Sequence, residues 1–221
     1  MLRKETLQFL KQLKQHNNKD WFAAHRDQYE AAHQNFEELA AEVLKATAKF
    51  DPTTKEITPA KAVLRINRDL RFAKDKTPYH PAFRLSLSQD GKLGNAVGYF
   101  LHCEPGAAFV AGGLLGGTPA DIKHVRQEIH YNWEEFRGLL HAKAFQSVFG
   151  DLQKTAEFSL KRPPRSYDAH DPAIDYLKLK TFAARHPLTD AELLADDLVA
   201  TLTQAFRAVH PVLDFLNRDL K

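Results

Sequence analysis

Apolar side chains recur every three or four residues near the start of the chain, which predicts helices there. The leucines of residues 7–13 form one helical stripe, and Thr6 is placed to cap its start. Asn18 is placed to cap a second, longer helix, whose apolar stripe continues until Asp51-Pro52 ends it. The N-terminal quarter of the chain is therefore predicted to be helical.

The apolar period changes to two at Val63, which is typical of half-buried strands. The hairpin-length turns between these segments, such as Gln89–Lys92 and Pro105-Gly106, favour an antiparallel meander. The alternating segments predict four strands, at residues 63–67, 82–88, 97–104 and 107–114.

Helical spacing returns after Thr118-Pro119, a good helix start with a cap and a proline at the first position. Further on, Thr189 and Glu192 form a capping box that is predicted to open a final helix, kinked or interrupted by Pro211. The fold class predicted from this order is α+β: N-terminal helices, a central antiparallel sheet meander, and C-terminal helices packed on the sheet.

The glycines at 112, 113, 116 and 117 stand before the helix that starts at Thr118-Pro119. A glycine-rich loop before a helix can cradle an anion, but this spacing matches neither a P-loop nor a dinucleotide fingerprint. A plain connection between strand and helix is the favoured interpretation.

Composition adds bounds rather than a function. The chain has 221 residues, a net charge of +3, 43% hydrophobic residues and one cysteine, Cys103. This excludes an intrachain disulfide and a multi-cysteine zinc site, and it fits a reducing compartment. No apolar run approaches the ~18 residues of a membrane span, and the N-terminus lacks a signal peptide. We therefore expect one cytoplasmic domain over residues 1–221, with no membrane partner.

The chemistry of the sequence is concentrated in Arg65–Pro81, which reads RINRDLRFAKDKTPYHP. Five of its 17 residues are cationic, and only Asp69 and Asp75 oppose them. Apolar side chains at Leu64, Ile66, Leu70 and Phe72 alternate with the charges, which predicts that the segment is anchored to a core. The cations are Arg65, Arg68, Arg71, Lys74 and Lys76.

Three-residue spacing of the arginines allows their guanidinium groups to converge on a helical or tightly extended backbone. Each guanidinium can make a bidentate, charge-assisted pair with a phosphate or carboxylate. We therefore predict a site for a small, phosphorylated anionic ligand, in which Asp69 orients a guanidinium. The predicted ligand-binding residues are Arg65, Arg68, Asp69, Arg71, Lys74, Lys76 and Tyr79.

Two other interpretations of the same segment stay open. The cations can form an internal salt-bridge network with Asp69, Asp75 and Glu104, which would make the chain a ligand-free structural or interaction protein. Alternatively, the segment can join the basic residues of Lys161–Tyr167 in a nucleic-acid-binding surface, with Phe72 and Tyr167 stacking on bases. The mild net charge does not favour the nucleic-acid interpretation.

Candidates for acid–base or metal chemistry are weaker. Tyr79 and His80 lie between two prolines, but a packed tyrosine and a surface histidine are the simpler interpretation. His102 and the segment Asp168–Asp171 have atoms that suit a metal, yet Asp and His are also common in turns and helix caps. Cys103 lies in an alternating strand and is predicted to be a buried small hydrophobe. We predict no metal, no cofactor and no assigned catalytic residue.

Four stretches together carry a resemblance to one known family: NNKDWF (17–22), RINRDLRFAKDKTPYHP (65–81), GYFLHCEPG (98–106) and LKRPPRSYDAHDPAIDYLKLKTF (160–182). With their neighbours they resemble the domain-of-unknown-function family DUF2461 over nearly the whole chain. The resemblance implies an intracellular α+β domain and brings no catalytic residue with it. Asp168–Asp171 departs from the family, since similar proteins tend to have proline and lysine after the tyrosine.

Overall fold

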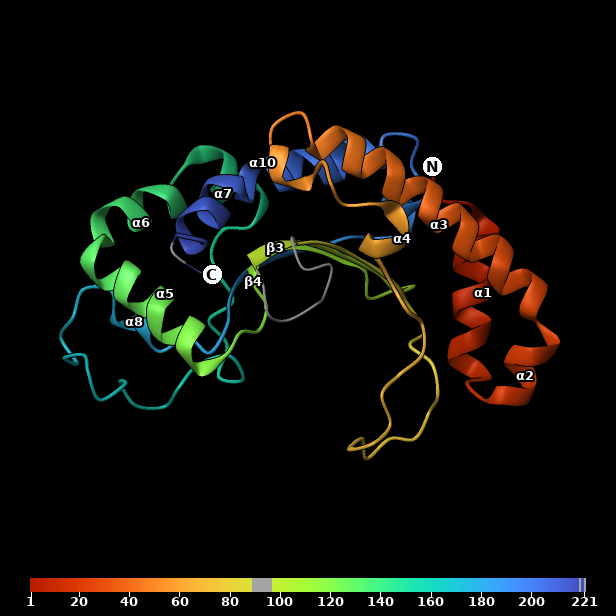
Figure 1. The fold of residues 1–221 in the computed structure, drawn as a ribbon, viewed down its shortest axis with the longest axis horizontal. Coiled ribbons are helices and arrows are strands. Elements are labelled where there is room, and N and C mark those ends of the chain that lie inside the picture. Colours follow the sequence, from red (N-terminus) through yellow and green to blue (C-terminus); the bar gives the residue numbers. More distant parts are fainter. Residues whose placement is uncertain (89–96, 219, 221) are drawn as a thin grey trace. The chain divides into compact units, whose positions relative to one another are not determined.

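A computed structural model describes residues 1–88, 97–218 and 220 (Figure 1). The chain groups into two compact units that share several elements, since β3, β4, β5 and α10 have residues in both. The prediction of one domain over residues 1–221 stays a prediction. The first unit comprises Met1–Leu87, Phe100–Val110 and Pro187–Thr203; the second comprises Ser88–Tyr99, Ala111–His186 and Gln204–Lys221.

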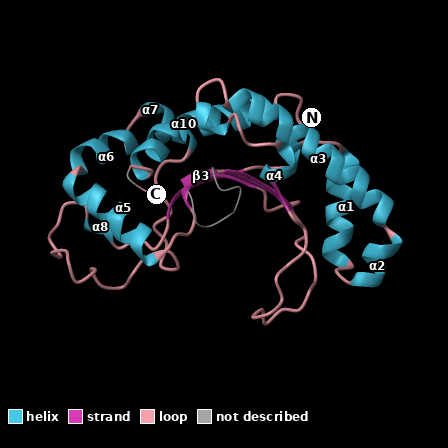
Figure 2. Cartoon of the chain, viewed as in Figure 1, coloured by secondary structure: helices cyan, strands magenta, loops and turns pink. Residues whose placement is uncertain are grey.

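The predicted α+β class is confirmed, with N-terminal helices, an antiparallel sheet and C-terminal helices that pack on it (Figure 2). The strands lie in the sheet in chain order, β1 to β5. Their bounds are β1 Val63–Leu64, β2 Phe83–Leu87, β3 Val97–Cys103, β4 Phe109–Leu114 and β5 Phe182–Pro187.

Two differences from the predicted strands have physical reasons. β1 is two residues long because the chain leaves the sheet at Arg65. Its two residues pair with β2, Val63 opposite Leu85 and Leu64 opposite Arg84. β5 was not predicted, because FAARHP has small residues, a charge and a proline instead of alternation. The predicted turn at 89–92 lies outside the described residues.

In the first unit, the helices α1 and α3 pack side by side, and α3 also contacts β2 (Figure 1). Phe36 of α3 stacks on Phe83 of β2 with 5.3 Å between ring centroids, and both rings are buried. The complete helices of this unit are α1 Lys4–Gln15, α2 Lys19–Ala24, α3 Arg26–Thr47, the 3-10 turn η1 Pro52–Thr54, α4 Pro59–Ala62 and α9 Asp190–Leu193.

Two predictions about the N-terminal helices are wrong. Thr6 does not cap α1, which begins at Lys4; its hydroxyl instead donates to Oδ1 of buried Asn35 over 2.8 Å. The long second helix is two helices, because the backbone of His25 leaves the helical conformation between α2 and α3. The predicted cap at Asn18 is confirmed, since its side chain accepts from the amide of Trp21.

In the second unit, short helices pack in sequence, α5 against α6 and α8, and α6 against α7. Phe136 of α6 and Phe215 of α10 meet at 4.9 Å between centroids in the core. The complete helices are α5 Pro119–Tyr131, α6 Trp133–Leu140, α7 Lys143–Val148 and α8 Ile174–Leu177, and the unit also holds residues 204–216 of α10, which spans Leu198–Leu216.

The predicted helix starts at Thr118 and Thr189 are both confirmed as capping boxes. The box at Thr189 opens only the four-residue helix α9, whereas α10 starts at Leu198 and continues through Pro211. The prediction that the Thr189 box opens the final helix is therefore wrong.

The glycines of β4 are explained by close packing within the second unit. A Cβ at Gly112 would lie 2.5 Å from Cγ1 of Val209 in α10. A Cβ at Gly113 would lie 2.1 Å from the carbonyl oxygen of Phe182 in β5, and its φ of +135° is one that side chains rarely adopt. Small residues here let a helix and a neighbouring strand approach the β4 backbone.

Candidate functional site

The segment Arg65–Pro81 forms a hairpin that leaves the sheet between β1 and β2, drawn in orange and yellow in Figure 1. Its arms are joined by backbone bonds: Arg68 N donates to Pro78 O over 2.9 Å, and His80 N donates to Ile66 O over 2.8 Å. An isolated antiparallel bridge pairs Asn67 with Tyr79. The cations are thus carried on an ordered pair of arms.

The root of the hairpin is fixed to the α1–α2 connection. The Asn17 side chain donates to Tyr79 O over 2.9 Å and accepts from Tyr79 N over 3.1 Å. The Tyr79 ring stacks on Phe22 with centroids 4.1 Å apart, and Ile66 is buried. The predicted anchoring therefore holds at the root. It fails at Phe72, which is 96% exposed because the tip extends beyond any packed element.

Arg68 joins the two arms through side chains. Its Nη1 lies 2.5 Å from Oδ2 of Asp75 and donates to the Thr77 carbonyl over 3.1 Å and to the Thr77 hydroxyl. Asp75 also accepts from the Thr77 amide, and these bonds lower its pKa to about 2. This pairing is the arrangement that the internal-network interpretation predicts.

Arg71 is paired within its own arm. Its guanidinium makes a two-pronged contact with Asp69, at 3.0 Å from Nε to Oδ1 and 2.6 Å from Nη2 to Oδ2. This pair lowers the pKa of Asp69 to about 2. The Arg71 side chain is nevertheless 79% exposed, so one edge of its guanidinium stays open to solvent. Asp69 is therefore the described partner of this arginine, and its role toward a bound anion stays a prediction.

Arg65 differs from the other two arginines. Within the described part of the chain its exposed side chain makes no ion pair or hydrogen bond, and neither does that of Lys74. Lys76 donates to the Leu70 carbonyl over 3.0 Å and meets no carboxylate among the described residues. Glu104, the third acid of the predicted network, instead pairs with Lys14 at 2.7 Å and with His102 at 3.0 Å.

A further cation that sequence reasoning missed lies beside Arg65. Nη2 of Arg84 donates to the Arg65 carbonyl over 2.9 Å, while its buried Nε has no partner among the described residues. Burial, and then the charge of Arg65, lowers the pKa of Arg84. Burial and these nearby guanidinium groups also lower the pKa of His80 to about 4. In a segment of alternating apolar and polar residues, an arginine is expected to face solvent. The role of Arg84 was therefore not predicted.

Two hollows share Asn67 as a lining residue. The first, of about 430 Å³, is lined by residues of the first arm. The second, of about 530 Å³, lies between that arm and the helices α2 and α3. The first is lined by Arg65, Asn67, Arg68, Asp69, Leu70 and Arg71; the second by Lys19, Phe22, Ala23, Arg26, Tyr29, Asn67 and Tyr79. The three predicted arginines therefore line one cavity.

Comparison with known families confirms the family resemblance seen in the sequence. The sequence model of a family described as "Conserved hypothetical protein (DUF2461)" matches residues 5–215. The chain belongs to the DUF2461 family. Comparisons with curated proteins and with solved structures give no match. The hairpin and both hollows lie inside the matched range, so they are features of the DUF2461 region of the chain.

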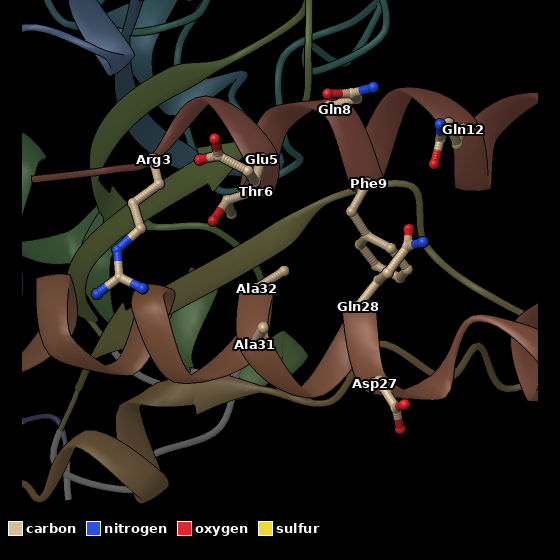
Figure 3. Close-up of a pocket in the computed structure, with 10 residues that line it drawn as sticks. All are labelled: Arg3, Glu5, Thr6, Gln8, Phe9, Gln12, Asp27, Gln28, Ala31 and Ala32. Carbon is tan, nitrogen blue, oxygen red and sulfur yellow. The ribbon is translucent and has the colours of Figure 1, made fainter.

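A third hollow of the DUF2461 protein lies between α1 and α3 and has a volume of about 570 Å³ (Figure 3). In Figure 3, Phe9 reaches from α1 toward Gln28 of α3. Its lining carries Glu5 and Asp27 as well as Arg3, and Arg3 is already paired with Glu38 at 3.1 Å. The charges thus give an anion no net attraction, so this larger hollow is a poorer anion site than the one at Arg65.

The remaining candidates of the DUF2461 chain have structural partners. Cys103 is fully buried, and burial raises the pKa of its thiol to about 12, which leaves it unreactive. Asp171 pairs with His130 at 2.6 Å and accepts from the amide of Ala173. In the described residues, no three potential ligands gather as a metal site. No described helix is long and apolar enough to cross a membrane.

Proposed function

We propose that this DUF2461 protein binds a small phosphorylated anion in the hollow lined by Arg65, Arg68 and Arg71. The observation that carries the proposal is the Arg65 side chain, a cation that lines a cavity of about 430 Å³ and meets no carboxylate among the described residues. A guanidinium of this kind is free to make a bidentate pair with a phosphate.

The neighbouring charges support this site. Asp69 is the one acid in the lining of this hollow, and its two-pronged pair with Arg71 offsets its charge. Arg84 beside Arg65 adds a second positive charge without a described carboxylate partner. Lys74 and Lys76 add charge to the same hairpin, which raises the local concentration of anions.

The test is calorimetric titration of inorganic phosphate into the full chain and into two matched variants. Arg65→Ala removes the open guanidinium, and we expect it to weaken phosphate binding about tenfold or more, the scale of one charge-assisted hydrogen-bonded pair. Arg137→Ala removes an exposed arginine of α6 in the second unit, outside both basic segments, and is expected to leave the affinity unchanged.

A thermal-shift measurement with the same three proteins gives an independent readout, because a ligand of the native state raises the melting temperature by mass action. Absence of binding to the natural sequence, or equal loss in both variants, would refute the proposal. A loss confined to Arg65→Ala supports it.

Nucleic acid is a second candidate, favoured by one observation: Phe72 is 96% exposed on a hairpin that also carries Arg71, Lys74 and Lys76. An exposed ring among cations suits stacking on a base of a single strand. We expect such binding to weaken steeply with added salt and to fall in Phe72→Ala, while phosphate binding in that variant is unchanged. Salt-insensitive binding would exclude this candidate.

A cytoplasmic location forms part of the proposal. The chain has one cysteine, Cys103, and the structure buries it as a thiol. A protein that needs no disulfide is suited to a reducing compartment, where phosphorylated metabolites are also found. Localisation of the tagged full chain by cell fractionation would test this part.

A further inference from the structure

The second hollow, between the hairpin and the helices α2 and α3, holds polar groups that no part of the described chain engages. The phenolic oxygens of Tyr29 and Tyr79 make no hydrogen bond with any described residue, and the same holds for the amide of Asn67 and the ammonium of Lys19. Arg26 is the exception, since it pairs with Glu30 at 2.7 Å. The four residues that carry these groups all line one cavity of about 530 Å³.

The aromatic rings of this hollow are not arranged to sandwich a flat ligand. One face of Tyr79 is covered by Phe22 at 4.1 Å, and the whole residue is only 8% exposed. The guanidinium of Arg26 lies over the ring of Tyr29 at 5.5 Å, and Phe22 contacts the same ring at 4.9 Å. The faces of these two rings are therefore partly covered by neighbouring side chains.

The phenols and the carboxamide of the lining suit a hydroxylated group, and the ammonium of Lys19 can donate to one. A phenol or a carboxamide both donates and accepts hydrogen bonds, as a sugar hydroxyl does. A nucleobase would need an open ring face for stacking, and a long alkyl chain would leave these polar groups without partners. A sugar ring, with hydroxyl groups around its edge, satisfies them.

Asn67 lines both hollows, so the two lie on neighbouring parts of the hairpin. We infer that the anion of the proposed function is a sugar phosphate, whose phosphate lies at Arg65 and whose sugar lies at Tyr29 and Tyr79. The inference rests on the proposed function. It adds Lys19, Tyr29 and Asn67 to the binding site. None of these three residues is among the ligand-binding residues predicted from the sequence.

The experiment compares four probes by calorimetry with the full chain: glucose 6-phosphate, glucose, inorganic phosphate and AMP. Glucose 6-phosphate is expected to bind about tenfold tighter than phosphate, since two further neutral hydrogen bonds contribute on this scale. In the double variant Tyr29→Phe and Tyr79→Phe, this advantage is expected to vanish while phosphate binding stays the same. Unchanged phosphate binding also shows that the variant folds.

Tyr131→Phe is the matched control, because Tyr131 is 75% exposed in the second unit. The inference is overturned if glucose 6-phosphate binds no tighter than phosphate, if AMP binds tighter than glucose 6-phosphate, or if the double variant keeps the sugar-phosphate advantage. Each of these results leaves the phosphate site intact. Failure of phosphate itself to bind, or its insensitivity to Arg65→Ala, overturns the proposed function and this inference with it.

Discussion

Arg68 and Asp75 join the two arms of the hairpin, with 2.5 Å between Nη1 and Oδ2. The Arg68 side chain is only 22% exposed, although it lies in a loop. The guanidinium of Arg68 contacts Asp75 and Thr77 on the opposite arm. Arg71, in contrast, pairs with Asp69 on its own arm. The three arginines of one motif thus have three environments: a cross-link, a local pair and an open cation.

Replacement of Arg68 by alanine should raise the pKa of Asp75 from about 2, because a side-chain hydrogen bond to the carboxylate is lost. The pKa should stay below its ordinary value, since the amide of Thr77 makes the larger contribution and remains. Carboxyl-carbon NMR over an acid titration measures both effects. Arg71→Ala is the control and should leave Asp75 unchanged. An Asp75 pKa that does not respond to Arg68→Ala would contradict the cross-link.

The proposed phosphate site can also be tested by removing its acid, which should strengthen binding, instead of a cation. Asp69→Asn frees the guanidinium of Arg71 and deletes the one negative charge that lines the cavity. Phosphate affinity is then expected to rise several-fold, because a carboxylate that repels the phosphate is removed from an exposed, salt-screened site. Calorimetry at low and high salt measures the change, and the gain should shrink with salt.

Glu157→Gln is a suitable control for that experiment, because it deletes an exposed acid of the second unit. If it raises phosphate affinity as much as Asp69→Asn does, net charge and not the hollow controls binding. An unchanged affinity in Asp69→Asn would favour the internal-network interpretation of the hairpin.

Much of this fold follows from local rules of sequence. The caps at Asn18 and Thr118 were predictable because each side chain bonds an amide three residues away. β5 was not, because nothing local in FAARHP requires a strand; its residues pair with β4 across the chain. Thr6 shows the same limit, since Asn35, its partner, is 29 positions distant.

One part of the candidate site could likewise be predicted from local sequence, and the other part could not. Spacing alone placed Arg65, Arg68 and Arg71 together, and they do line one hollow. The second hollow joins Asn67 to Tyr29 of α3, a juxtaposition that depends on how the hairpin root docks on the helices. The signal that could have found it is Asn17 in NNKDWF, whose amide fixes Tyr79 and so ties the two motifs together.

His80 makes stability depend on pH. Burial is the first cause that lowers its pKa from 6.5 to about 4, followed by nearby cations. Between these values the unfolded chain binds the proton more tightly, so the stabilisation is present above about pH 6.5 and is lost as the pH falls toward 4. The nearby cations are Arg84, Arg68, His102 and Arg65.

The His80→Gln variant should therefore lose less stability than the natural sequence between pH 7 and about 4.5. The difference is on the order of 1 kcal/mol, since a half-exposed group is partly screened by solvent. Urea unfolding at several pH values measures it, with exposed His170→Gln as the control. Parallel pH profiles for all three proteins would show that His80 titrates normally.

Glycine in β4 is required by the backbone of the next strand. In Gly113→Ala, the added Cβ would lie 2.1 Å from the Phe182 carbonyl oxygen, and the φ of +135° is unfavourable for alanine. The strands β4 and β5 must therefore move apart. The expected loss is more than about 3 kcal/mol of unfolding free energy, the range of core overpacking with backbone strain. In Gly138→Ala, within α6, nothing lies within 4 Å of the new Cβ. That variant should gain about 0.5–1 kcal/mol from helix propensity. Chemical denaturation of both proteins distinguishes the two effects, and a similar small change in each would mean that β4 and β5 do not pack this closely.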